Sequence, residues 1–176
     1  MKIKQLSLLL LLAVTFFALN SCSNDEPKSP IYTDYEYSVE ISEGYSMIYT
    51  FTCTYTDICT NETYTKPVGN LGPSIFFGNC VGMGKAKDVV FKVEGTLKDN
   101  AKEIVEDAIA KHKSVTVGCR YSAMSSTYMD EAKTKPAKNL LTFAENFEST
   151  ISAEGLKYYL DNEPTIVLFE KHFTIK

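Results

Sequence analysis

The sequence has no tryptophan and only two histidines, and its five cysteines form no Cys-x-x-Cys pair. The absence of tryptophan disfavours stacking on sugar rings. The cysteine spacing and the histidine count disfavour a zinc site, which usually draws on closely spaced cysteines or several histidines. The chain also lacks the Gly-x-Ser-x-Gly elbow, the His-Glu-x-x-His helix, the EF-hand loop and the dinucleotide-binding fingerprint. These absences predict a protein without metal, cofactor or catalytic set, and therefore not an enzyme.

Acidic residues outnumber basic residues by 22 to 18. If residues 1–21 are removed as a signal, Lys2 and Lys4 leave with them and every acidic residue stays, so the mature chain carries a net charge of about −6. This mild acidic excess keeps a protein soluble and disfavours nucleic acid or an anionic bilayer surface as a partner.

The N-terminus has the pattern of an export signal. Lys2 and Lys4 precede an apolar stretch of about fifteen residues, which is shorter than the ~20 needed to span a bilayer. It ends in Leu19-Asn20-Ser21-Cys22, which resembles the lipobox of bacterial lipoproteins. The resemblance implies that Cys22 receives the lipid and becomes the first residue of the mature chain. The alternative is an ordinary secretory signal with an incidental cysteine.

The residues that follow Cys22 are polar and rich in proline, from Ser23 to Pro30. Such a stretch cannot bury a core, so it predicts a flexible tether. The order Cys-Ser-Asn-Asp-Glu also resembles surface-exported lipoproteins of the Bacteroidota, which implies a lipid anchor in the outer membrane with the protein exposed at the cell surface. We therefore predict a signal peptide over 1–21, a tether over 22–31 and a single globular domain over 32–176.

Four cysteines remain for the domain: Cys53, Cys59, Cys80 and Cys119. An even number in an exported protein favours disulfides, although four cysteines allow three pairings and the sequence does not choose among them. Cys53 with Cys59 would close a small loop and Cys80 with Cys119 a larger one. Reduced thiols are the alternative.

Alternation of apolar and polar residues predicts the strands. Residues 35–41 and 45–55 flank Glu43-Gly44 and indicate an N-terminal β-hairpin. Further strands are expected near 74–77, 89–93, 115–121 and 165–169, the last a continuous apolar run typical of a central strand. Residues 57–73 are expected to form a loop with at most a short strand near Tyr64, and 122–139 a long loop or weak helix. Residues 140–147 fit either a strand or a helical turn.

Two helices are expected, one after Asn100 with an apolar stripe facing the sheet, and a shorter one capped by Ser152. The predicted fold class is α+β: an antiparallel or mixed sheet of about six strands, with an N-terminal hairpin and about two helices packed on one face.

The chain contains eleven tyrosines, six of them between Tyr32 and Tyr55. Tyrosine buries apolar area while keeping a polar tip, so it serves both cores and recognition surfaces. Five of them share the apolar face of the first two predicted strands, which places them in the core: Tyr35, Tyr37, Tyr45, Tyr49 and Tyr55. Four others that lie outside this face are the candidates for binding: Tyr32, Tyr64, Tyr121 and Tyr128.

Other reactive groups have plainer interpretations. His112 follows the longer helix, where a cation complements the helix dipole, and His172 is expected on the surface. Gly84 and Lys85 invite comparison with a phosphate-binding loop, but the glycine spacing is wrong and the segment predicts a flexible turn. Acidic pairs such as Asp34 and Glu36 fit solvated faces.

The sequence therefore favours a non-catalytic binding module on a lipid anchor, with an envelope protein or glycan as candidate partner. Two alternatives stay open: an immunity or inhibitor lipoprotein directed against a secreted toxin, and a small exported hydrolase or thiol enzyme.

Overall fold

The computed structural model describes residues 31–70 and 72–175. The predicted signal, the lipobox with Cys22 and nearly all of the tether lie outside the described residues. Within the described part of the chain, no helix has the length and apolar character needed to cross a bilayer.

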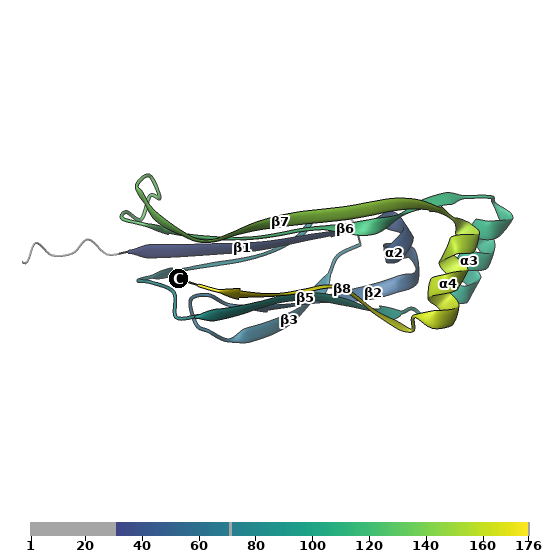
Figure 1. Cartoon of the computed structure of the whole chain (residues 1–176), viewed down its shortest axis with the longest axis horizontal. Coiled ribbons are helices and arrows are strands. Elements are labelled where there is room, and N and C mark those ends of the chain that lie inside the picture. The colour runs from purple at the N-terminus through teal and green to yellow at the C-terminus, as the bar shows by residue number, and fades with distance from the viewer. Residues whose placement is uncertain (1–30, 71, 176) are drawn as a thin grey trace, which may run out of the picture.

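The fold is a sandwich of two four-stranded antiparallel sheets (Figure 1). We call them the first and the second sheet. In spatial order, the first sheet consists of β4 (Ser74–Val81), β1 (Tyr32–Ile41), β6 (Ser114–Tyr128) and β7 (Pro136–Ser152). The second sheet consists of β3 (Thr63–Val68), β2 (Tyr49–Thr56), β5 (Asp88–Leu97) and β8 (Thr165–Thr174).

Aromatic side chains fill the space between the sheets. The five tyrosines predicted for the core are each at most 8% exposed, which confirms that prediction. Three of their hydroxyls donate inside the protein: Tyr37 to the Thr56 carbonyl at 2.7 Å, Tyr49 to the Glu163 carbonyl at 2.7 Å and Tyr45 to the Tyr159 hydroxyl at 3.2 Å. A phenol can be buried when its hydroxyl finds such a partner.

Three helices lie together at one end of the sandwich: α2 (Glu43–Ile48), α3 (Ala101–Ala110) and α4 (Ala153–Asn162) (Figure 1). The expected apolar stripe of α3 buries Ala101, Val105 and Ala108. The helices therefore close one end of the core, whereas the sequence predicted that they would cover one face of a sheet.

The predicted N-terminal hairpin is wrong. β1 and β2 belong to different sheets, and α2 carries the chain from one sheet to the other. Gly44 in α2 packs so closely on β6 that an added Cβ would lie 2.7 Å from the Thr116 carbonyl oxygen. Tyr45 and Met47 continue the alternation of the strand that follows, so periodicity suggested a second strand from residue 45, but the apolar residues buried in α2 are Tyr45 and Ile48, at helical spacing.

The single sheet of about six strands is also wrong in detail, although the chain is antiparallel and mixes α and β elements. Residues 122–139 are mostly strand: β6 runs on to Tyr128, and β7 begins at Pro136. Inward-facing Ser125 and Thr127 donate hydrogen bonds to the carbonyls of Asp34 and Lys138, so small polar residues occupy core positions. β8, expected to be central, lies at the edge of the second sheet.

Candidate functional site

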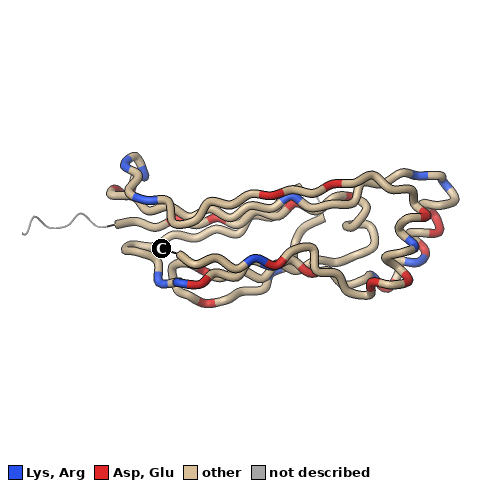
Figure 2. The backbone as a smooth tube through the Cα atoms, in the orientation of Figure 1, with Lys and Arg blue, Asp and Glu red and all other residues tan. Residues whose placement is uncertain are grey.

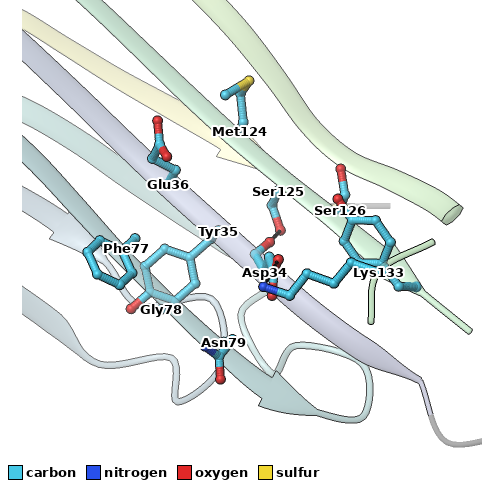
Figure 3. A pocket seen from close by; sticks show the side chains of 11 residues that line it. Asp34, Tyr35, Glu36, Phe77, Gly78, Asn79, Met124, Ser125, Ser126 and Lys133 are labelled. Atoms are coloured by element: carbon cyan, nitrogen blue, oxygen red, sulfur yellow. Dashed lines mark hydrogen bonds and ion pairs between the residues drawn. The ribbon is translucent and has the colours of Figure 1, made fainter. Parts of the chain in front are cut away.

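A cavity of about 380 Å³ opens on the outer face of the first sheet (Figure 3). It lies over the N-terminal part of β1, and β1 begins at the end of the sandwich opposite the helices (Figure 1). Strands β1, β4 and β6 form its floor, and the turn between β6 and β7 supplies Lys133. The register of the sheet builds this floor, because Phe77, Glu36 and Met124 are directly opposite one another on neighbouring strands.

Asp34 lies at the centre of the cavity. Its Oδ2 atom is 2.6 Å from Nζ of Lys133, and the Asp34 side chain is 25% exposed (Figure 3). Its Oδ1 atom is buried and accepts no hydrogen bond from the described residues. The sequence predicted a solvated face for Asp34; instead the neighbouring strands and Lys133 cover most of it, and one carboxylate oxygen is left without a donor.

The turn that carries Lys133 is fixed by Asp130. The Asp130 carboxylate accepts the Thr134 hydroxyl and the backbone N–H groups of Thr134 and Lys135, the last at 2.8 Å. These hydrogen bonds hold the pKa of Asp130 below its ordinary value, and the bond from the Thr134 hydroxyl has the largest effect. Lys133 itself has a left-handed backbone, with φ of 57°. The turn thus holds Lys133 over Asp34 before any ligand arrives.

The rest of the cavity combines apolar and polar groups. Phe77 is 74% exposed and Met124 47%, and Glu36 lies between them. Asn79 and Ser126 contribute further hydrogen-bonding side chains. With two carboxylates and one ammonium in its lining, the site suits a neutral or cationic ligand that has hydrogen-bond donors and an apolar part.

The structure brings only some of the candidate tyrosines to this site. Tyr128 lines the cavity, and Tyr32 is its direct partner in the register of β1 and β6. Tyr64 lies on β3 in the second sheet and donates to Glu62. Tyr121 is 5% exposed and donates to Glu145 at 2.6 Å; burial raises its pKa. Tyr121 belongs to the core and is not available to a ligand.

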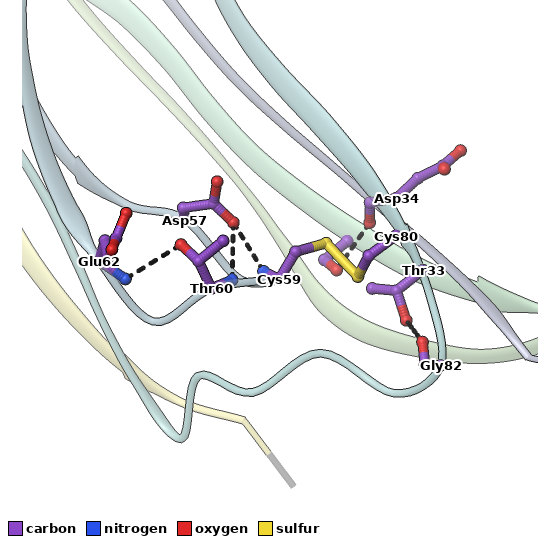
Figure 4. The surroundings of a disulfide bond; sticks show 9 residues. Thr33, Asp34, Asp57, Cys59, Thr60, Glu62, Cys80 and Gly82 are labelled. Carbon is purple, nitrogen blue, oxygen red and sulfur yellow. Dashed lines mark hydrogen bonds between the residues drawn. A yellow bond between two sulfur atoms is a disulfide. The ribbon is translucent and has the colours of Figure 1, made fainter.

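A disulfide ties the sheets together near the cavity (Figure 4). Cys59 in the turn between β2 and β3 is bonded to Cys80 on β4, with the Cα atoms 5.8 Å apart. Asp57 orders the turn, since its carboxylate accepts the N–H groups of Cys59 and Thr60 at 2.7 and 3.0 Å. The other two cysteines, Cys53 and Cys119, are free and buried, so the expectation of disulfides holds for one pair only.

The free thiols and the two histidines lie outside the lining of the cavity. Burial raises the pKa of Cys53 and of Cys119 to about 12, which keeps both thiols protonated near neutral pH. His112 follows the C-terminus of α3, whereas His172 is exposed on β8 beside Glu170. Among the residues that the structure describes, no group of three or more histidines, cysteines or carboxylates is placed to hold a metal ion.

Of the candidate tyrosines, Tyr128 lines the cavity and Tyr32 lies beside it, whereas Asp34, Lys133 and Phe77 were not among the candidate binding residues. The only sequence signal for Asp34 and Phe77 was their place in the alternation of polar and apolar residues along a strand. The position of Lys133 depends on the conformation of the turn formed by residues 129–135.

Comparison with protein-family models, with curated proteins and with solved structures finds nothing that matches this chain.

Proposed function

We propose that this protein is a lipid-anchored binding module of the cell envelope, whose cavity on the first sheet recognises a partner without catalysis. The observation that carries the proposal is the Asp34 Oδ1 atom, a buried acceptor without a donor at the centre of an open cavity. Burying a carboxylate oxygen is costly unless a hydrogen bond compensates. The Oδ1 atom is closed to solvent, so a ligand hydroxyl, amide or amine would supply that donor once the side chains that cover it shift.

The surroundings of Asp34 favour a partner of mixed polarity. Exposed Phe77 and Met124 offer apolar contact beside the acceptor, and Tyr128 adds an amphipathic ring at the mouth of the cavity. Such a mixture of aromatic and hydrogen-bonding groups is common at protein recognition sites. An envelope protein that presents a side chain with a donor fits this lining, and so does a glycan hydroxyl.

The position of the cavity agrees with an anchor at Cys22. β1 begins at Tyr32, at the cavity end of the sandwich (Figure 1). The nine residues between Cys22 and Tyr32 span at most about 30 Å when extended. An anchored protein would therefore keep its cavity close to the membrane surface, where other envelope components lie. We place the protein in the outer membrane, exposed at the cell surface.

The test is capture from intact cells with the tagged full chain and an Asp34→Ala variant. We expect the native chain to recover a specific partner and the variant to lose it, because the variant removes the acceptor. A Glu148→Ala variant, which changes an exposed carboxylate on β7 outside the cavity, is the matched control. Recovery of the same partner by the native chain and Asp34→Ala would reject this site, and recovery of none would reject the function.

A further inference from the structure

Four strands lie at the edges of the two sheets, and three of them carry features that prevent further pairing. A free edge is a template for another strand, and proteins protect such edges with charges, prolines or bulges. Charged residues of both signs are interspersed along the sandwich (Figure 2). The protecting features are Lys66 and Pro67 on β3, Glu145 and Glu148 with two register shifts along β7, and Glu170 and Lys171 with one register shift along β8.

The fourth edge, β4, has none of these features. Its sequence from Ser74 to Val81 contains no charged residue and no proline, and its pairing with β1 runs without a register shift. Its outward side chains are also unusually exposed for apolar residues: Phe77 is 74%, Val81 72% and Ile75 50% exposed. A straight, uncharged and apolar edge is what strand pairing between molecules requires.

The backbone of β4 is oriented for that pairing. The Gly82 N–H donates to the Ile31 carbonyl, and this hydrogen bond identifies which residue pairs between β4 and β1 are the hydrogen-bonded ones. Because hydrogen-bonded and non-bonded pairs alternate, the N–H and C=O groups of Ile75, Phe77 and Val81 point away from β1. β4 ends the strand order of the first sheet, so no described strand accepts these groups.

We propose that β4 pairs antiparallel with β4 of a second copy of this chain, about a twofold axis at Gly78. In this register Ile75 of each copy lies opposite Val81 of the other, and Phe77 lies opposite Asn79. The outward-pointing backbone groups then meet in hydrogen-bonded pairs, and the two first sheets become one eight-stranded sheet.

The distribution of charge around β4 favours a second copy of the chain as the partner of this edge. β4 is uncharged, so pairing of two copies of β4 places no like charges opposite each other. The nearest acidic residues of the outer face, Asp34 and Glu36, lie on β1. Three strand spacings, about 14 Å, separate β1 of one copy from β1 of the other. That distance exceeds the Debye length of ~8 Å at physiological ionic strength, so the acidic rows repel weakly. One strand buries less than the ~800 Å² per partner of a stable complex, so the dimer should be weak and concentration-dependent.

The test is sedimentation equilibrium of the full chain, with its anchor in neutral detergent, over a wide range of protein concentration. One variant carries Ile75→Lys with Val81→Lys, and another carries Ile75→Glu with Val81→Glu. In the proposed register these positions face each other, so each variant alone sets like charges opposite and should raise the dimer dissociation constant about tenfold or more. An equimolar mixture of the two sets opposite charges together and should restore the dimer.

The control is Val167→Lys, which introduces the same charge at a residue 54% exposed on a different edge strand, β8. It should leave the dimer unchanged, and the thermal unfolding midpoint of every variant should stay close to that of the native chain. A native chain that stays monomeric at all concentrations overturns the proposal, as does a mixture that fails to recover the dimer or a species that grows beyond two copies. Phe77 and Asn79 line the Asp34 cavity but Ile75 and Val81 do not, so these variants change the β4 edge without changing the cavity lining.

Discussion

Lys133 lies 2.6 Å from Asp34 although the two residues come from distant parts of the chain, one from the turn after β6 and one from β1. The pair is partly solvated, with side-chain exposures of 46% and 25%. Exposed ion pairs contribute little to stability, so this contact positions the two groups more than it stabilises the fold. Lys133 therefore covers one oxygen of Asp34, and the other is buried without a donor among the described residues, so a ligand reaches it only when the covering side chains shift.

Replacing Lys133 with methionine tests this division of roles. We expect the free energy of unfolding to change by less than about 1 kcal/mol, because partly exposed pairs seldom contribute more. Partner capture from intact cells should nevertheless weaken. Urea unfolding gives the first quantity, and Lys102→Met, which removes an exposed pair with Glu106 on α3, is the control for both. A loss of several kcal/mol would show that Lys133 has a structural role instead.

The disulfide should stabilise the cavity end of the sandwich. Cys59 and Cys80 are 21 residues apart, and closing a loop of about that size contributes roughly 3 kcal/mol through the unfolded state. Replacing both cysteines with serine should lower the free energy of unfolding by about that amount, measured in urea. A reducing agent should destabilise the native chain similarly and leave the double variant unaffected. Equal sensitivity of both chains to the reducing agent would contradict the assigned bond.

The free thiols predict a dependence of stability on alkaline pH. Burial raises the pKa of Cys53 and Cys119 to about 12 in the folded protein, whereas the unfolded thiols ionise near 9. The unfolded state therefore loses its protons first, and the free energy of unfolding should fall as the pH rises from about 9 towards 12. Buried Tyr49, whose pKa burial raises to about 12, contributes in the same direction. A Cys53→Ala, Cys119→Ala variant should show a shallower fall.

Access to those thiols provides a separate measurement. At pH 8 a thiol reagent should leave Cys53 and Cys119 unmodified in the folded chain and label both after unfolding, because the side chains are fully buried and protonated. Rapid labelling of either thiol in the native state would reopen the interpretation as a thiol enzyme.

Local patterns in the sequence predicted the strands and helices better than their arrangement. The alternation in β1, β5 and β6 and the apolar stripe of α3 arise because each element buries one face. The spacing of the apolar residues is enough to predict such an element. Whether β1 and β2 share a sheet depends on α2, whose buried Tyr45 keeps the apolar phase of a strand. At the serine- and threonine-rich end of β6, the inward-facing hydroxyls donate hydrogen bonds to backbone carbonyls. The residue types alone do not predict that these polar side chains are buried in a strand. The cavity depends on strand register and on one turn, both of which are set by tertiary contacts.

The lipid anchor gives the last prediction. A chain lipidated at Cys22 should label with fatty acid and fractionate with the outer membrane, because each buried methylene adds ~0.8 kcal/mol of membrane affinity and several acyl chains hold a protein almost permanently. Cys22→Ser removes the acceptor thiol, so the variant should lose the label and either appear in the soluble fraction or accumulate unprocessed. Ser21→Ala keeps a small residue before the cysteine and is the control that should retain label and location. Cys22→Ser protein that still labels and stays in the membrane would show that the anchor lies elsewhere.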